Sequence, residues 1–217
     1  MTTVGLWLVD LREPCDERLL TGRDRARRDA LRDPGDRRRF AAAHAALNRV
    51  VRERLGGIEP RWTIGPNGKP EVAGLQVNLS HAGEHALIAV TETRPVGVDL
   101  QDLGPAPAVE ALARRFFPPG EAESVAAHGP AEFARLWARK EAVLKAAGDR
   151  LMRGLALPVA GDPPPAVVHD GAAYAVADVE APDGYRAAIA LAGPEPFTVR
   201  VDCHPNALTQ RYRSAGS

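Results

Sequence analysis

The sequence contains no apolar run that approaches the roughly 20 residues needed to span a bilayer. Its first residues lack the basic start and the long apolar core of a signal peptide, so we expect a cytoplasmic protein with no membrane partner. Cysteine is also scarce, because the chain has only Cys15 and Cys203, which lie far apart and match no zinc or redox spacing. We interpret both thiols as reduced and structural.

An excess of charge of either sign is missing as well. Lys plus Arg and Asp plus Glu number 28 each, so the chain lacks the positive field of a general nucleic-acid binder. The arginine-rich segment 23–39 keeps such a binder open as an alternative, although acidic residues are interspersed in it. We expect no nucleic-acid partner, and any electrostatic function must be local.

The 217 residues are enough to build a core without disulfides. Alternating apolar residues predict an opening strand over 3–11, and a helix is expected from near Asp36 to the stop at Gly56-Gly57. Short apolar runs bounded by Gly, Pro or Asn predict strands at 61–64, 75–80, 85–90 and 95–100.

A similar order follows a proline-rich hinge at 104–107. A helical region is expected over 109–148, then strands at 166–169, 173–179, 185–191 and 197–201, with a tight turn at Asp170-Gly171. The sequence therefore predicts an α+β fold of two similar halves, 1–103 and 104–217, each a helix against a small sheet. We expect them to pack as a pseudo-twofold unit within one monomeric chain, with the active site between them and a flexible tail from about 206.

The segment 133–148 carries the most informative pattern. At 100° per residue its apolar side chains share one arc, and Lys140 falls near the middle of that arc. A lysine there must snorkel or meet an anion, because a buried ammonium needs a partner. Glu141 and Lys145 lie one turn apart at the edge of the arc, where an exposed ion pair is the alternative to a functional role.

Oxygen-bearing side chains end the strand expected at 95–100. Period-two alternation places Asp99 and Gln101 on the face opposite the apolar residues. Together with Glu141 they would suit magnesium, which prefers carboxylate and other oxygen ligands. A simple turn-forming role for Asp99 is the alternative.

Two further groups are typical of phosphate contacts. Lys69 follows the tight-turn pair Asn67-Gly68, and Ser80-His81 ends a strand at a loop. Neighbouring strand residues face opposite ways, which argues against a nucleophile–base dyad of Ser80 and His81. A histidine that only satisfies a turn is the alternative.

Taken in order, these motifs resemble the surfactin-synthetase-activating type of 4′-phosphopantetheinyl transferase. The segments are GKP at 68–70, NLSHAG at 78–83, VGVDLQ at 96–101 and WARKEAVLKAAG at 137–148. The family patterns are G-K-P, N-x-S-H-S/A-G, G-V/I-D-I/L-E and W-x-x-K-E-A-x-x-K-x-x-G, and the resemblance covers about 23–157. It implies a Mg²⁺ enzyme that moves phosphopantetheine from coenzyme A (CoA) to a serine of an acyl, polyketide or peptidyl carrier protein.

The resemblance also implies roles for particular residues. Asp99 and Glu141 match the metal ligands, and Glu141, Lys145 and His81 match the catalytic groups. CoA contacts are expected from Arg39, Lys69, Pro70, Ser80, His81, Lys140 and Lys145, with Arg27 assisting. The carrier protein is expected to dock between Phe116-Phe117 and Phe133, and a core role for Phe116 and Phe117 is the alternative.

One position departs from the family pattern. Gln101 stands where the family often has Glu, so we expect it to reach the metal through a water and the metal site to depend on CoA for assembly. This departure keeps open a non-catalytic CoA- or carrier-binding module. A metal-dependent phosphoesterase is a further alternative, because the same ligands and cations suit that chemistry.

Overall fold

The computed structural model describes residues 1–104, 108–149 and 154–202. The helices are α1 (Gly22–Ala30), α2 (Pro34–Arg54), α3 (Val109–Phe116), α4 (Pro119–His128) and α5 (Pro130–Ala147), with 3-10 turns at Glu17–Leu19 and Pro66–Gly68. The strands are β1 (Thr2–Asp10), β2 (Trp62–Ile64), β3 (Pro70–Val72), β4 (Gln76–Ala82), β5 (His85–Thr91), β6 (Val96–Asp102), β7 (Val167–His169), β8 (Ala172–Val179), β9 (Tyr185–Ala192) and β10 (Phe197–Val201).

Local signals explain where the helices begin and end. Asp33 caps α2 by accepting the backbone N–H of Asp36 at 2.9 Å, so the helix begins slightly earlier than the expected Asp36. The helical region expected over 109–148 is three helices, because prolines at 118–119 and 130 cannot continue a helix. Gly148 ends α5 with a φ of 72°, a left-handed conformation that favours glycine.

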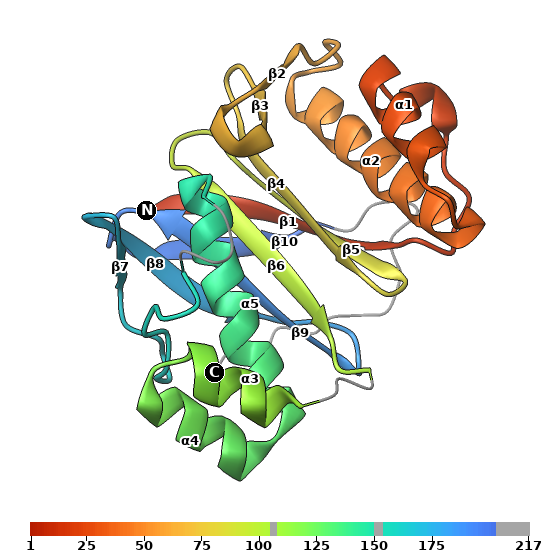
Figure 1. Cartoon of the computed structure of the whole chain (residues 1–217). Helices are drawn as coiled ribbons and strands as arrows, with labels where there is room; N and C mark the ends of the chain where they lie inside the picture. The colour runs from red at the N-terminus through yellow and green to blue at the C-terminus, as the bar shows by residue number, and fades with distance from the viewer. Residues whose placement is uncertain (105–107, 150–153, 203–217) are drawn as a thin grey trace.

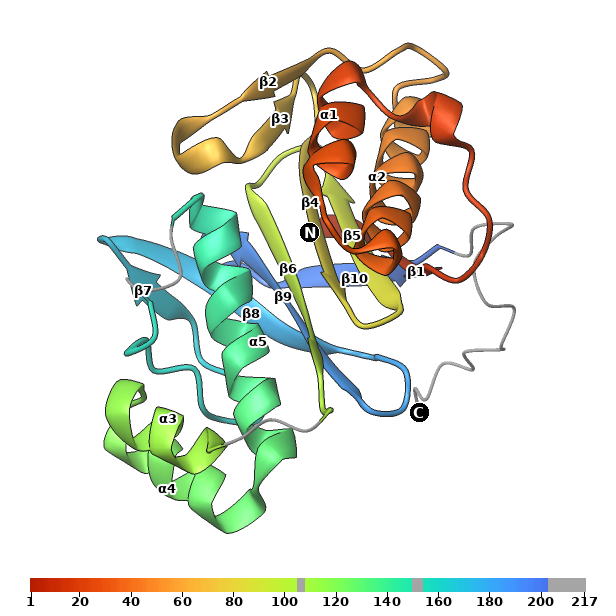
Figure 2. The ribbon, with the colours of Figure 1, turned by 45° about the vertical axis from the view of Figure 1, so that its right-hand side comes forward.

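Two four-stranded sheets form the framework, in the orders β10-β1-β5-β4 and β6-β9-β8-β7. All neighbours are antiparallel except β1 and β10, and β2 and β3 form a separate hairpin. Each sheet carries one long helix, α2 on the first and α5 on the second (Figures 1 and 2). The predicted α+β fold of two helix-plus-sheet halves is confirmed.

The halves share one core and also exchange strands. Apolar side chains from β1 and β5 pack against those from β6 and β9, on the faces turned away from α2 and α5. The strand β6 lies in the second sheet although it precedes residue 103, and β10 from the end of the chain pairs with β1. The boundary expected at residues 103 and 104 therefore does not separate the two sheets.

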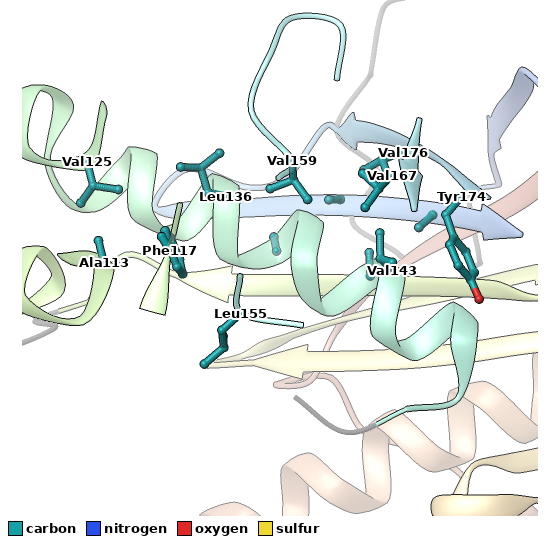
Figure 3. Packing of buried hydrophobic residues seen from close by; sticks show 14 of the residues in the cluster. Ala113, Phe117, Val125, Leu136, Val143, Leu155, Val159, Val167, Tyr174 and Val176 are labelled. Atoms are coloured by element: carbon teal, nitrogen blue, oxygen red, sulfur yellow. The ribbon is translucent and has the colours of Figure 1, made fainter. Parts of the chain in front are cut away.

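A second apolar cluster fixes α5 on its own sheet. Leu136 and Val143 of α5 pack among side chains from α3, α4, β7 and β8, including Phe117, Val125 and Tyr174 (Figure 3). Phe117 stacks on Phe133 at a ring-centroid distance of 5.3 Å, so these phenylalanines belong to the core. This packing determines which face of α5 is turned toward its sheet.

The junction between the halves runs along β4 and β6, which lie side by side (Figure 1). Asn78 and Ser80 of β4 accept the backbone N–H groups of Val98 and Leu100 of β6, at 2.9 and 3.3 Å. Residues 105–107 of the hinge expected at 104–107, and the tail from 206, lie outside the described residues. No helix among residues 1–104, 108–149 and 154–202 is long and apolar enough to cross a membrane.

Candidate active site

Asp99 lies at the centre of the junction between the halves. Only 2% of the residue is exposed, yet its carboxylate has three polar partners. Oδ1 accepts from Ser80 Oγ at 2.8 Å and from Lys145 Nζ at 2.5 Å, and Oδ2 accepts from Gln101 Nε2 at 2.6 Å. Asp99 and Gln101 thus share one face of β6, as the strand alternation predicts. The site joins β4, β6 and α5.

Glu141 of α5 faces the same junction. Burial and the charge of Asp99 raise the pKa of Glu141, while Lys145 and a hydrogen bond from Trp137 oppose the rise. Close packing of β6 on α5 brings the two acids together, because Gly97 has no side chain. A Cβ at Gly97 would lie 2.0 Å from the carbonyl oxygen of Ala142.

The donor set fits a hard divalent cation. A cation between two neighbouring carboxylates relieves their mutual repulsion, and oxygen ligands suit Mg²⁺. Asp99 and Glu141 would supply the charged ligands and Gln101 a neutral amide oxygen. In the structure, Asp99 forms an ion pair with the ammonium of Lys145, and 27% of the Lys145 side chain is exposed.

A cavity of about 360 Å³, the central cavity, opens beside Asp99. Its polar wall residues are Arg27, His44, Asn78, Ser80, His81 and Lys145, and its other wall residues are Leu47, Gly68, Pro70, Val77 and Leu79. The described wall residues include several basic groups and no carboxylate, which suits an anionic ligand. Removal from water and the cations of His44 and Lys145 lower the pKa of His81.

The sequence analysis missed His44, which lies on α2 in a buried polar network. His44 Nδ1 is 3.1 Å from Asp24 Oδ1, and its ring stacks on Phe40 with centroids 4.0 Å apart. Asp24 also accepts from Asn48 at 3.1 Å and from Thr21, so its carboxylate fixes the imidazole toward the cavity. The capping box of Thr21 and Asp24 predicts only the start of α1, and the contact of Asp24 with His44 depends on how α1 packs on α2.

A neighbouring cavity of about 320 Å³ extends the central cavity. The two share Arg27, His44, Leu47 and Pro70 in their walls, and Trp62 and Ile64 add apolar surface to the second. Pro70, for which the sequence predicted a contact with CoA, lies in the wall of both cavities. An elongated ligand with a charged part near Lys145 and an apolar part near Trp62 would fit both.

Lys140, for which the sequence predicted a contact with CoA, does not line the central cavity in the described structure. Its side chain is 0% exposed and lies on the far side of α5 from the central cavity. Nζ donates to Glu121 Oε2 at 2.5 Å and to the carbonyl of Leu157, and lies 4.5 Å from the ring centroid of Phe117. The anion that the sequence predicted for this ammonium is therefore a glutamate of α4.

Arg39 and Lys69 also point away from the cavity walls. The Arg39 guanidinium pairs with Asp36 at 2.6 Å and with Glu84 at 3.1 Å, so its charge is already matched. Lys69 Nζ donates to the carbonyl of Lys145 at 2.7 Å, at the end of α5. In the part of the chain that the structure describes, neither side chain lines the central cavity or its neighbour, where the sequence predicted contacts with CoA.

Another group of potential metal ligands occurs at the β7–β8 turn. Within the described ranges, Asp149, His169 and Asp170 are the one cluster of three His, Cys, Asp or Glu side chains with ligand atoms mutually close. His169 Nε2 already lies 3.0 Å from Asp149 Oδ2. The sequence predicted a turn at Asp170 but no metal ligand among the three residues, and none of them lines the central cavity.

The fold and the site define a transferase. Residues 95–190, which include β6 and α5, match the family model of the 4′-phosphopantetheinyl transferase superfamily. The 4′-phosphopantetheinyl transferase HetI of Nostoc sp. is 34% identical over 209 residues, which are 88% of each chain. The chain therefore belongs to the 4′-phosphopantetheinyl transferase superfamily and is an enzyme of that family.

Two shorter matches name the same class of enzyme. AcpT of Salmonella typhimurium is 34% identical over 107 residues, which are 46% of this chain and 56% of AcpT. The transferase psf-1 of Bacillus pumilus is 36% identical over 97 residues, which are 41% of this chain and 40% of psf-1. These relatives support the enzyme class that the motifs indicated.

Proposed function

We propose that this enzyme transfers the 4′-phosphopantetheine group of CoA to a serine hydroxyl of a carrier protein and releases 3′,5′-ADP. The observation that carries the proposal is the position of the buried Asp99. Its carboxylate contacts Lys145 and Ser80, which line the basic central cavity, and it lies near the second acid, Glu141. Cations in the cavity suit the phosphates of CoA, and the acids suit a metal and a proton acceptor.

Each side chain has a role in this reaction. The serine oxygen attacks the β-phosphorus of CoA, and the bond from that phosphorus to the oxygen of the ADP leaving group breaks. Lys145 and His81 stabilise the charge that develops on the diphosphate oxygens. Glu141, whose pKa is raised by burial and by Asp99, accepts the serine proton through a water. His44 and Arg27 bind the distal phosphate of the nucleotide end.

Asp99, Glu141 and Gln101 would hold Mg²⁺. When bound, the ion would neutralise negative charge on the diphosphate oxygens and orient them. Lys145, which pairs with Asp99 in the structure, would then be available to the phosphates. The family resemblance and the fit of these ligands support this part of the proposal.

The partner is an acyl, polyketide or peptidyl carrier protein. We assign the enzyme to the surfactin-synthetase-activating type because both halves of the site lie in one chain, which also supports a monomer. A cytoplasmic location is proposed from the sequence. The docking surface includes Leu112 of α3, which is 40% exposed, and the neighbouring Phe116 with Arg115 over its ring at 5.0 Å. This surface adjoins the segment that the motifs indicated.

Intact-mass measurement of an apo-carrier protein incubated with enzyme, CoA and Mg²⁺ tests the proposal. The carrier should gain the mass of phosphopantetheine, and Asp99→Ala and Glu141→Gln should each abolish the gain. Asp102→Ala is the matched control, because Asp102 ends the same strand but is exposed and bonds only the nearby Gly104 N–H in the described structure.

Other products would identify the alternatives. Release of ADP or phosphate without an acceptor protein would indicate a phosphoesterase. Tight binding of CoA or carrier protein without any product would indicate a non-catalytic module. Full turnover in both Asp99→Ala and Glu141→Gln would contradict the assigned metal site.

A further inference from the structure

Lysine is rare in this protein, and each of its three lysines meets a specific set of acceptors. Lys140 pairs with Glu121 and Lys145 pairs with Asp99. Lys69, the third, lies between β2 and β3 and directs its ammonium to backbone oxygens. Its side chain is mostly buried, and burial lowers its pKa against the opposing charge of Glu71.

The contacts of Lys69 cross from the first half to the second. Nζ donates to the carbonyl of Lys145 at 2.7 Å and lies 3.4 Å from the carbonyls of Ala146 and Val96. The last carbonyls of a helix have no partner within the helix and carry its negative dipole end, so an ammonium there stabilises the final turn. Val96 begins β6, the strand that carries Asp99.

The hairpin around Lys69 has a second anchor on each side. Asn67 Nδ2 donates to the carbonyl of Gly148 at 3.0 Å, directly beyond α5. On the opposite side, Trp62 Nε1 donates to Asn48 Oδ1 of α2 at 2.8 Å. The hairpin therefore bridges α2 and α5, the long helices of the two halves (Figure 2).

Lys69 and its neighbours face in different directions. Gly68 and Pro70 line the central cavity, whereas Lys69 lines a separate hollow with Ala146, Ala147 and Gly148. The segment thus contacts the ligand cavity with its flanking residues and α5 with its lysine.

We infer that Lys69 is a positioning residue, which acts on the transfer reaction by holding the last turn of α5, and with it Lys145, against the central cavity. The inference rests on the proposed function and excludes a direct contact of Lys69 with a CoA phosphate. A displaced Lys145 would still allow CoA to bind, because Arg27, His44 and His81 remain in the cavity wall. The transferring phosphate would lose its aligned cation, and such misplacement costs up to about 100-fold in rate.

The test is the steady-state kinetics of Lys69→Met, which keeps the length of the side chain and removes its charge. We expect kcat to fall about 10- to 100-fold while KM for CoA changes by no more than about threefold. Asn67→Ala, which removes the hydrogen bond to the carbonyl of Gly148, should also lower kcat, but by a smaller factor. Lys69→Arg, which keeps the positive charge, should lose less activity than Lys69→Met.

The opposite pattern would overturn the inference. A KM for CoA that rises about tenfold or more with unchanged kcat would place Lys69 on a phosphate, and unchanged values of both would leave it without a role. If Lys69→Met does not fold, the kcat of Asn67→Ala decides. A wild-type enzyme that transfers nothing would end the proposed function instead, so the two failures are distinguishable.

Discussion

Replacing Lys140 by Met tests whether this lysine has a structural role. The variant would leave the carboxylate of Glu121 buried, with 3% of the residue exposed, and without its cation. Breaking a buried pair by removing one partner costs about 3–5 kcal/mol. At about 2–4 °C per kcal/mol for a chain of this size, the melting temperature should fall by about 6–20 °C.

The pair also fixes the chain that follows α5. Glu121 Oε1 accepts the backbone N–H groups of Val159 at 2.6 Å and Ala160 at 2.9 Å, and Lys140 donates to the carbonyl of Leu157. A second substitution that removes the uncompensated charge, Lys140→Met with Glu121→Gln, should therefore recover part of the loss. We expect a coupling free energy of about 0.5–3 kcal/mol between the two sites.

Urea denaturation gives the free energies of unfolding, and calorimetry gives the affinity for CoA. Arg114→Met is the control, because its ion pair with Glu110 on α3 is exposed and worth only about 0.3–0.5 kcal/mol. Lys140→Met should bind CoA with wild-type affinity at a temperature where it is folded. Stability equal to that of Arg114→Met, together with lost CoA affinity, would refute the reasoning.

Four further predictions concern stability and metal binding. Burial raises the pKa of Asp24, but hydrogen bonds from His44 and Thr21 outweigh this effect and hold the pKa below 3.8. The ionised carboxylate therefore stabilises the fold above pH 3.8, and this stabilisation is lost as the pH falls through the lowered pKa. Asp24→Asn should lower the free energy of unfolding at neutral pH by about 1.5–3 kcal/mol, measured by urea denaturation. The variant should also lose less stability than the wild type as the pH falls. Gly97→Ala should cost about 1–3 kcal/mol by overpacking against α5, whereas the unobstructed Gly120→Ala in α4 should stabilise by about 0.4–1 kcal/mol. Since burial and Asp99 raise the pKa of Glu141 above 4.5, stability of the metal-free enzyme should fall as pH rises through that raised value, and Glu141→Gln should remove the fall. Calorimetry should show weak Mg²⁺ binding without CoA and tighter binding with it; tight binding to the enzyme alone would contradict the site.

Local patterns in the sequence predicted most elements and part of the site. Alternation in β6 placed Asp99 and Gln101 on one face, and they are hydrogen-bonded to each other. The helical period placed Lys140 among apolar residues, and it is fully buried. The Asp170-Gly171 turn between β7 and β8 was also expected, and both residues have positive φ. These features depend on neighbours a few residues apart, which the sequence shows directly.

Other features were decided by contacts between residues far apart in the chain. The direction of Lys69 could not be predicted, because a three-residue strand after a 3-10 turn has no extended alternation. The glutamate that pairs with Lys140 lies on a different helix, and His44 became a candidate only when Asp24 was seen to hold its ring.

By itself, the sequence determined the α+β class, the strand and helix faces, and the motifs that indicate phosphopantetheinyl transfer. The tertiary structure alone decided that β6 and β10 exchange between the halves and that Lys145, rather than Lys140, meets Asp99. The physical reason is that a pattern of apolar residues specifies which face of an element is buried. The partner of each buried polar group depends on how the elements pack, and that packing is settled only when the whole chain has folded.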